Sequence, residues 1–134
     1  MPNMSLIYGH RGVPVKFPEN SLAGFAYAIS HHIDGLEFDV HLTQDQIPVI
    51  MHDERIDRTT NGQGAIADLT FEQLRRFELA NGEPVPSLQE FLNLVSGEPV
   101  HLNLELKTDR HYYLDIERIV LRMVRQTDLI YPVV

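Results

Sequence analysis

The sequence contains no cysteine, and this absence excludes disulfide bonds and thiolate metal sites. It has no apolar run long enough to cross a membrane, and its start lacks the basic and apolar regions of a signal peptide. Basic residues are also scarce, because 11 Lys and Arg stand against 19 Asp and Glu for a formal charge of −8. A nucleic-acid-binding surface needs the opposite balance. We therefore expect a cytoplasmic protein that binds no nucleic acid.

What is present favours a single α/β domain. The 134 residues are 43% hydrophobic, which can support one core. Apolar runs of strand length alternate with amphipathic segments, a pattern typical of a mainly parallel sheet with helical connections. The expected strands are 5–9, 34–41, 47–52 and 100–106, with a fifth beginning near 129. The expected helices start at 20 or 21 and run to 31, then cover 71–78, 88–95 and 113–126. The rest of 54–86 is expected to be irregular.

The connection between the second and third expected strands spans only about six residues. A parallel connection normally needs a dozen residues or more, and it usually contains a helix. Two arrangements remain open from the sequence. Either these two strands form an antiparallel hairpin, or the crossover between them lacks its helix.

Two carboxylates, Glu37 and Asp39, lie two residues apart in an otherwise apolar strand. Because side chains alternate along a strand, both point to the same face. Glu105 stands in the same relation to the leucines of the 100–106 strand. Three carboxylate donors together suit Mg²⁺ or Ca²⁺, and without a cation they would repel one another. The alternative is the polar, solvent-facing side of an antiparallel sheet; the third carboxylate favours the metal.

His10 and His52 each lie at the end of an expected strand, where functional residues of parallel sheets gather. Two imidazoles beside one site can divide general acid and general base work near neutral pH. The alternative for either is a structural histidine that is hydrogen-bonded in a loop or core. His41 and His101 share faces with the carboxylates and could line the same site.

Further polar residues flank these histidines. Arg11 could hold a phosphate group, or it could form an ordinary surface ion pair. Lys107 could bind the same phosphate or pair with Glu105. Asn20, Glu19 and Asp53 are weaker candidates. Asn20 could be a helix cap, and Glu19 could either face the site or be a first-turn carboxylate that the helix dipole stabilises. Asp53 could either orient His52 or only end the strand.

Motifs in a fixed order cover nearly the whole chain, and together they make it resemble the glycerophosphodiester phosphodiesterases, a family of phospholipase C-like barrels. They are His10-Arg11-Gly12, Pro18-Glu19-Asn20, Gly35-x-Glu37-x-Asp39-Val40, Thr43-x-Asp45, Pro48-Val49-x-x-His52-Asp53, Arg58-Thr59-Thr60, Val85-Pro86-Ser87-Leu88 and Asn103-Leu104-Glu105-Leu106-Lys107.

The resemblance implies a TIM-type (β/α)₈ barrel that hydrolyses a small glycerophosphodiester substrate to glycerol 3-phosphate and an alcohol. It implies that a divalent metal, Mg²⁺ or Ca²⁺, is bound by Glu37, Asp39 and Glu105. His10 and His52 would be the acid–base pair, and Arg11 and Lys107 would bind the substrate phosphate.

Two departures from the family pattern stand out. Gln46 occupies a position where the family usually has glycine, so a left-handed backbone there would cost about 1 kcal/mol. A complete barrel takes roughly 200 or more residues, so residues 1–134 are expected to form about the first half of one barrel domain, strands one to four and the start of the fifth. Such a half could belong to a longer protein, close a barrel as a homodimer, act as a non-catalytic oligomerisation or binding module, or serve as a bare cation-binding domain. The first is the expectation we favour.

Overall fold

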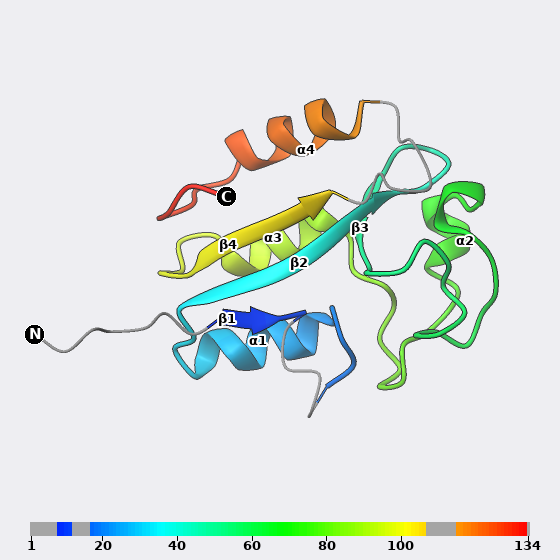
Figure 1. Ribbon diagram of the computed structural model, residues 1–134, viewed down its shortest axis with the longest axis horizontal. Coiled ribbons are helices and arrows are strands. Elements are labelled where there is room, and N and C mark those ends of the chain that lie inside the picture. Colours follow the sequence, from blue (N-terminus) through cyan, green and yellow to red (C-terminus); the bar gives the residue numbers. More distant parts are fainter. Residues whose placement is uncertain (1–7, 12–16, 107–114, 134) are drawn as a thin grey trace, which may run out of the picture.

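The structure, a computed structural model, describes residues 8–11, 17–106 and 115–133 of the chain. Strands and helices alternate as expected along most of it (Figure 1). The strands are β1 (Tyr8–His10), β2 (Gly35–Leu42), β3 (Pro48–Ile50) and β4 (His101–Leu106). The helices are α1 (Leu22–Ser30), η1 (Ile66–Asp68), α2 (Phe71–Leu74), α3 (Leu88–Val95) and α4 (Ile116–Arg125).

The long strand β2 is the centre of the sheet. It pairs in parallel with β1 and with β4, and its last residues pair with β3 in the antiparallel sense. The short connection between β2 and β3 is therefore a hairpin, which decides the question that the sequence left open. Gln46 lies in this turn with a φ of 65°, the left-handed conformation expected where the family usually has glycine.

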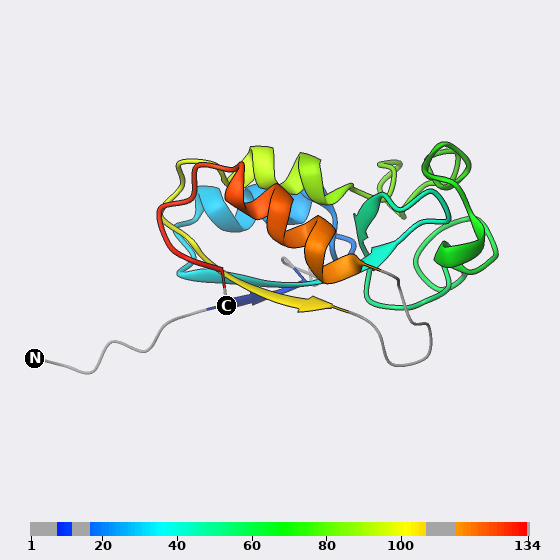
Figure 2. The ribbon, with the colours of Figure 1, turned by 90° about the horizontal axis from the view of Figure 1, so that it is seen from above.

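The helices α1, α3 and α4 all lie on one side of the sheet (Figure 2). Leu36, Phe38 and Val40 of β2 point toward them and are almost fully buried. Phe38 packs against Phe91 of α3 with ring centroids 4.3 Å apart, and Phe91 packs against Phe25 of α1 at 4.8 Å. The opposite face of the sheet carries no helix among the described residues. This one-sided arrangement is that of a barrel, whose helices form the outer layer.

Side-chain caps fix where the helices begin. The Ser21 hydroxyl accepts a hydrogen bond from the N–H of Gly24 and starts α1, so Ser21 is the cap, not Asn20. Ser87 and Glu90 form the capping box that the sequence predicts for α3. These caps satisfy backbone N–H groups that have no partner inside the helix.

Helix α2 is shorter than the expected 71–78, although its Thr70 capping box is formed. After Leu74 the chain changes to tighter turns, in which the N–H of Phe77 bonds to the carbonyl of Leu74. This early end lets Leu79 pair with Thr60 and lets the Phe77 ring pack on Gly62. Tertiary contacts thus override the local helical pattern.

The segment from 51 to 87 forms a small lobe beyond one end of the sheet, coloured green in Figure 1. It has a hydrophobic cluster of its own, distinct from the cluster between sheet and helices. Its buried members in the lobe are Met51, Ile56, Ile66, Leu74, Leu79 and Val85, and Val49 of β3 packs with them. Short antiparallel bridges join its turns, as between Arg55 and Ala65. The segment expected to be irregular is therefore poor in helix and strand but firmly packed.

The part of the chain after α4 returns to the sheet. Val133 forms a parallel bridge with Leu102 of β4, which is where a fifth parallel strand is expected to begin. Leu121 of α4 and Ile130, which follows this helix, each leave about half of their surface exposed. Within the residues that the structure describes, no helix is both long and apolar enough to cross a membrane.

Candidate active site

The sheet face without helices carries the predicted carboxylates. Asp39 of β2 lies opposite Glu105 of β4, and Glu37 lies between His10 of β1 and Asn103 of β4. Residues at such neighbouring positions on parallel strands are about 5 Å apart. Since β1, β2 and β4 run in one direction, His10 and Glu105 lie at or next to the carboxyl ends of their strands, whereas Glu37 and Asp39 lie beside them within the length of β2.

A small hollow of about 50 Å³ lies among these side chains. Glu37, Asp39 and Glu105 line it together with Arg11 and Asn103. Its volume suits a water molecule or a small ion and is too small for a phosphodiester. Asp39 is nearly buried, with 5% of its surface exposed, whereas Glu105 is exposed.

The chemistry of this hollow fits a hard divalent cation, because Mg²⁺ and Ca²⁺ prefer carboxylate and amide oxygens. Within the described residues, however, no three Asp, Glu, His or Cys side chains converge closely enough to hold one ion. The structure thus brings the three predicted ligands to one face and one hollow without placing them around a common point. Their assignment as metal ligands stays a prediction.

Arg11 joins the carboxylates to the loop before α1. Its backbone takes a left-handed φ of 57°, and its N–H donates to the carbonyl of Glu37 at 2.9 Å. Its guanidinium lies 3.8 Å from Asp39, measured from Nε to Oδ2, and its Nη1 donates to Glu19 at 3.2 Å. The side chain is largely buried, so this is not the ordinary surface ion pair considered from the sequence.

His52 follows β3 and lies beside Asp53, with Nδ1 3.0 Å from the Asp53 Oδ1. Arg58 donates to the same carboxylate through Nε at 2.8 Å. These hydrogen bonds, that from Arg58 above all, lower the pKa of Asp53 to about 2. Of the two interpretations left open for Asp53, the structure therefore supports the one in which it is the partner of His52.

Arg58 also holds Glu19, by two parallel hydrogen bonds of 2.8 and 2.9 Å. They are the main cause of the lowered pKa of Glu19, and they raise the pKa of Arg58 in turn. Glu19 therefore faces the site across the loop, because two guanidiniums, those of Arg58 and Arg11, converge on it. Sequence reasoning gave Arg58 no function of its own.

His41 is a second residue whose function was missed. It lies on the β2 face that carries Glu37 and Asp39, but it is fully buried and does not line the hollow. Its Nε2 donates to the backbone carbonyl of His52 at 3.1 Å. The one signal for His41 in the sequence is that it follows Glu37 and Asp39 at the same spacing of two residues. His41 thus holds the chain at His52.

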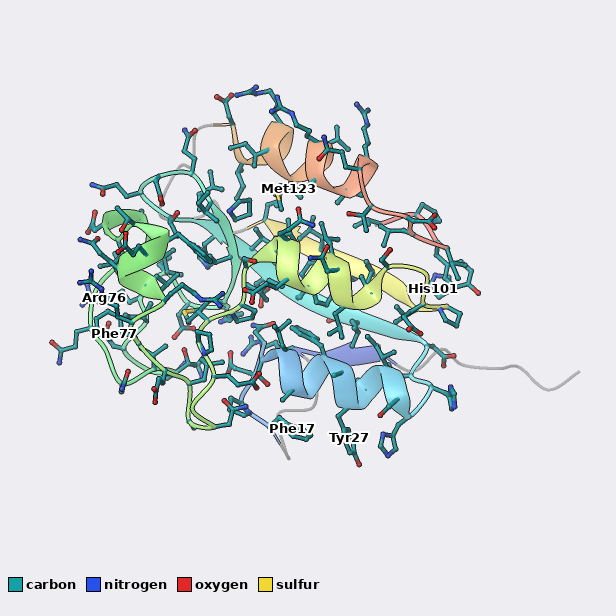
Figure 3. All side chains as sticks on the ribbon, turned by 180° about the vertical axis from the view of Figure 1, so that it is seen from behind. Phe17, Tyr27, Arg76, Phe77, His101 and Met123 are labelled. Carbon is teal, nitrogen blue, oxygen red and sulfur yellow. The ribbon has the colours of Figure 1, made fainter. Side chains whose placement is uncertain are left out.

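Other predicted site residues are placed as follows. His10 is the last residue of β1, opposite Glu37, but its side chain and the whole of Lys107 lie outside the described residues. His101, labelled in Figure 3, does not line the site, because it lies at the start of β4 and stacks on Tyr131 with ring centroids 4.0 Å apart. Asn20 is buried, and its side-chain amide has no hydrogen-bond partner within the described structure.

His52 and the carboxylates do not line the same hollow. His52 lies with Glu19, Asn20 and Thr59 around a separate, narrower depression. The two parts of the site are joined by the ion pairs from Asp39 through Arg11 to Glu19. Residues from four segments distant in sequence are thus brought to one edge of the sheet.

A mainly parallel sheet with helices on one face, and with charged residues on the other, defines about half of a TIM-type α/β barrel. The chain belongs to the glycerophosphoryl diester phosphodiesterase family, whose family model matches residues 10–131.

Individual relatives agree with this assignment. A glycerophosphodiester phosphodiesterase of Caldanaerobacter subterraneus is 34% identical over 129 residues, which are 91% of this chain and 53% of the relative. The crystal structure of a glycerophosphodiester phosphodiesterase from Agrobacterium tumefaciens superposes with a TM-score of 0.81 at 30% identity, covering 92% of this chain and 53% of that one.

An Oleispira antarctica phosphodiesterase, solved in complex with its product sn-glycerol-3-phosphate, superposes with a TM-score of 0.82 at 27% identity. The match covers 96% of this chain and 55% of that protein. The chain therefore spans about half the length of the relatives that it matches.

Proposed function

We propose that the chain supplies the strand-end catalytic and metal-binding residues of a phosphoric diester hydrolase that cleaves glycerophosphodiesters to glycerol 3-phosphate and an alcohol. The observation that carries this proposal is the hollow on the sheet face of β2 and β4, where the carboxylates Glu37, Asp39 and Glu105 lie together with Arg11. Membership in the family and the product bound to the Oleispira antarctica relative support the substrate class.

In this proposal Glu37, Asp39 and Glu105 bind a divalent cation, Mg²⁺ or Ca²⁺. Such a cation supplies Lewis-acid stabilisation of the negative charge that develops on the phosphate. The three carboxylates would hold it, and they come from two adjacent strands of one sheet. Asp39 is nearly buried, so its charge is only weakly screened by solvent.

Arg11 is proposed to bind the substrate phosphate, together with Lys107. The Nε of Arg11 is buried and makes no hydrogen bond within the described structure. A buried donor without an acceptor costs about 1–3 kcal/mol, and a phosphate oxygen in the hollow would remove that cost. This unsatisfied donor favours a ligand-binding function over a purely structural ion pair.

His10 and His52 are proposed to transfer the protons of the reaction. One takes a proton from the attacking hydroxyl group, and the other gives a proton to the departing alkoxide. General acid and base groups each contribute about 10²–10⁴-fold in rate. His10 ends β1 and His52 follows β3, and both of these strands pair with β2, which carries Glu37 and Asp39.

The test is hydrolysis of glycerophosphocholine by the chain, followed through released glycerol 3-phosphate, with Mg²⁺ or Ca²⁺ added and then removed by a chelator. We expect metal-dependent release that falls at least about 10²-fold in His52→Ala and in His10→Ala. His101→Ala is the matched control, because His101 lies away from the site. Absence of hydrolysis at every protein concentration, or full activity in both active-site variants, would refute the proposal.

Metal binding can be tested apart from turnover by calorimetric titration of the chain with Ca²⁺ alone. We expect Glu105→Gln and Asp39→Asn to weaken binding at least tenfold. Glu98→Gln is the control, because Glu98 lines a different part of the surface, near the ends of α1 and α3. Equal affinities in all three variants would show that the hollow is not the metal site.

A second candidate, a half barrel that associates with another copy of itself, is favoured by one observation. An apolar groove of about 720 Å³ runs between β4, α4 and the residues that follow, and it includes the exposed Leu121 and Ile130. Apolar surface of this kind is typical of association sites. The molar mass in solution tests it: a dimer that becomes a monomer in Leu121→Asp supports self-association, and a monomeric wild-type chain excludes it.

A further inference from the structure

Oppositely charged side chains alternate in a continuous row along the active-site edge. The row joins the sheet face to the loop before α1, to the lobe formed by 51–87, and to the end of β3. Its members, in order of contact, are Asp39, Arg11, Glu19, Arg58, Asp53 and His52. Because each of the first five members touches one of opposite charge, and His52 contacts the last of these, the row can hold its members in fixed positions.

Arg58 is the member with the most specific geometry. Its Nη1 and Nη2 donate to the two oxygens of Glu19, while Nε and Nη2 donate to the two oxygens of Asp53 at 2.8 and 3.1 Å. All three guanidinium nitrogens are thus in use, and the rigid fork sets the planes of both carboxylates. A lysine ammonium, which is a point charge, could not impose this orientation.

The Asp53 carboxylate determines which ring nitrogen of His52 carries the proton. This carboxyl is ionised near neutral pH, and the two hydrogen bonds from Arg58, which lower its pKa to about 2, hold it in one orientation beside His52. An ionised carboxylate accepts hydrogen bonds and cannot donate them. The contact of 3.0 Å therefore requires His52 to donate from Nδ1. In the neutral imidazole, the lone pair then lies on Nε2.

The loop that carries Arg58 is itself held in place. Ile56 is fully buried in the core of the lobe, and its carbonyl accepts a hydrogen bond from the Thr60 hydroxyl at 2.8 Å. Gly62 lies so close to the ring of Phe77 that an added Cβ would come within 2.4 Å of it. The lobe thus acts as a support for Arg58. His41 fixes the other side, through the His52 carbonyl.

We propose that Arg58, braced by Glu19, is a positioning residue that acts through Asp53 to confine proton exchange at His52 to the Nε2 atom. This inference rests on the proposed function, in which His52 transfers a proton. It adds a function for the lobe, because the lobe's core and the Gly62–Phe77 contact hold the guanidinium that orients the histidine.

The test is nitrogen NMR of the histidine rings in the ¹⁵N-labelled chain, since the ring nitrogen shifts report which nitrogen is protonated. The His52 signals are identified by their loss in His52→Ala. In the wild-type chain above the titration range we expect His52 to carry its proton on Nδ1. In Arg58→Gln we expect the Nε2–H tautomer to rise to at least about a tenth of the population, and Arg58→Lys to restore the wild-type pattern only in part.

Arg55→Gln is the matched control, because Arg55 lies on the same loop and pairs with Asp57 instead. It should leave the His52 signals unchanged. A wild-type His52 protonated on Nε2, or an unchanged tautomer in Arg58→Gln, would overturn the inference. If Arg58→Gln does not fold, Asp53→Asn replaces it in the test. The amide that this substitution introduces can donate a hydrogen bond to Nδ1 of His52, so that Nδ1 no longer has to be protonated.

Hydrolysis provides an independent readout. Misplacement of a catalytic group by about 1 Å can cost about 10²-fold in rate, so Arg58→Gln should lower kcat with KM little changed. The NMR result does not depend on turnover. A wild-type chain that shows the Nδ1–H tautomer but no hydrolysis would refute the proposed function alone, whereas hydrolysis without the expected tautomer would refute only the positioning function of Arg58.

Discussion

Removing the Arg58–Asp53 pair should weaken the folded state by an amount that depends on pH. Asp53 has its pKa lowered from 3.8 to about 2, chiefly by Arg58. Because one pKa unit corresponds to about 1.4 kcal/mol, this lowering is equivalent to at most about 2.5 kcal/mol. The pair is partly exposed, with 51% of the Arg58 side chain and 30% of the Asp53 side chain accessible. Solvent screening therefore reduces the expected contribution to about 1 kcal/mol.

The sign of the pH dependence follows from the direction of this change. A carboxyl whose pKa is lower in the folded state stabilises that state once the pH exceeds its unfolded value, here 3.8. The contribution is then lost as the pH falls from about 5 through 2, where the folded-state carboxylate is protonated. We expect a coupling of about 1 kcal/mol between Arg58 and Asp53 at neutral pH that shrinks over this window.

A double-mutant cycle isolates this coupling from the many other carboxylates of the chain. It requires the wild-type chain, Arg58→Gln, Asp53→Asn and the double variant, each unfolded by urea at several pH values. Unfolding is best followed by far-ultraviolet circular dichroism, because the sequence has no tryptophan. The Arg55–Asp57 pair, which is more exposed, serves as control and should show a smaller coupling that salt removes more easily. A coupling below about 0.3 kcal/mol at neutral pH, or one that does not change with pH, would refute the reasoning.

Three further substitutions test how the support is built. Gly62→Ala should lower the free energy of unfolding by about 1–3 kcal/mol, because the added Cβ meets the Phe77 ring. Introducing Phe77→Ala into the same chain should reduce the effect of Gly62→Ala. An unchanged effect would contradict the contact. Ser87→Ala should cost about 1 kcal/mol through loss of the α3 cap, and urea midpoints equal to wild type would contradict it. His41→Phe should cost about 1–3 kcal/mol, since it leaves the His52 carbonyl without its donor, and it should also disturb the ring signals of His52, whereas unchanged signals would refute its positioning function.

Features that depend on neighbouring residues were predictable from the sequence. The capping box at Ser87 acts over three residues, and α3 begins and ends where its pattern predicts, at Leu88 and Val95. The same holds for the alternation in β2, which assigns Glu37 and Asp39 to one face. The pattern at Thr70 gave the start of α2 correctly but not its end. That end is set by contacts of Phe77 and Leu79 with residues well before them in the chain.

The support around His52 could not be predicted in this way. Arg58 and Glu19 are 39 residues apart, and no local periodicity relates them. Arg58 belongs to a polar segment that, read alone, is an ordinary loop. Its function depends on the small core of the lobe, and that core depends in turn on how residues from Val49 to Val85 pack. A family motif indicates that Arg58 matters, but only the packed structure indicates to what it is bound.

The position of Glu105 depends on the hydrophobic core as much as on its own chemistry. Leu102, Leu104 and Leu106 of β4 pack against the helices, and this apolar face fixes the register in which Glu105 lies beside Asp39. A slip of one residue would turn Asn103 and Glu105 into the core and the leucines toward the site. The cost of burying a carboxylate without a partner is prohibitive, so a register shifted by one residue is excluded. The leucines that stabilise β4 therefore also place the third carboxylate of the proposed metal site.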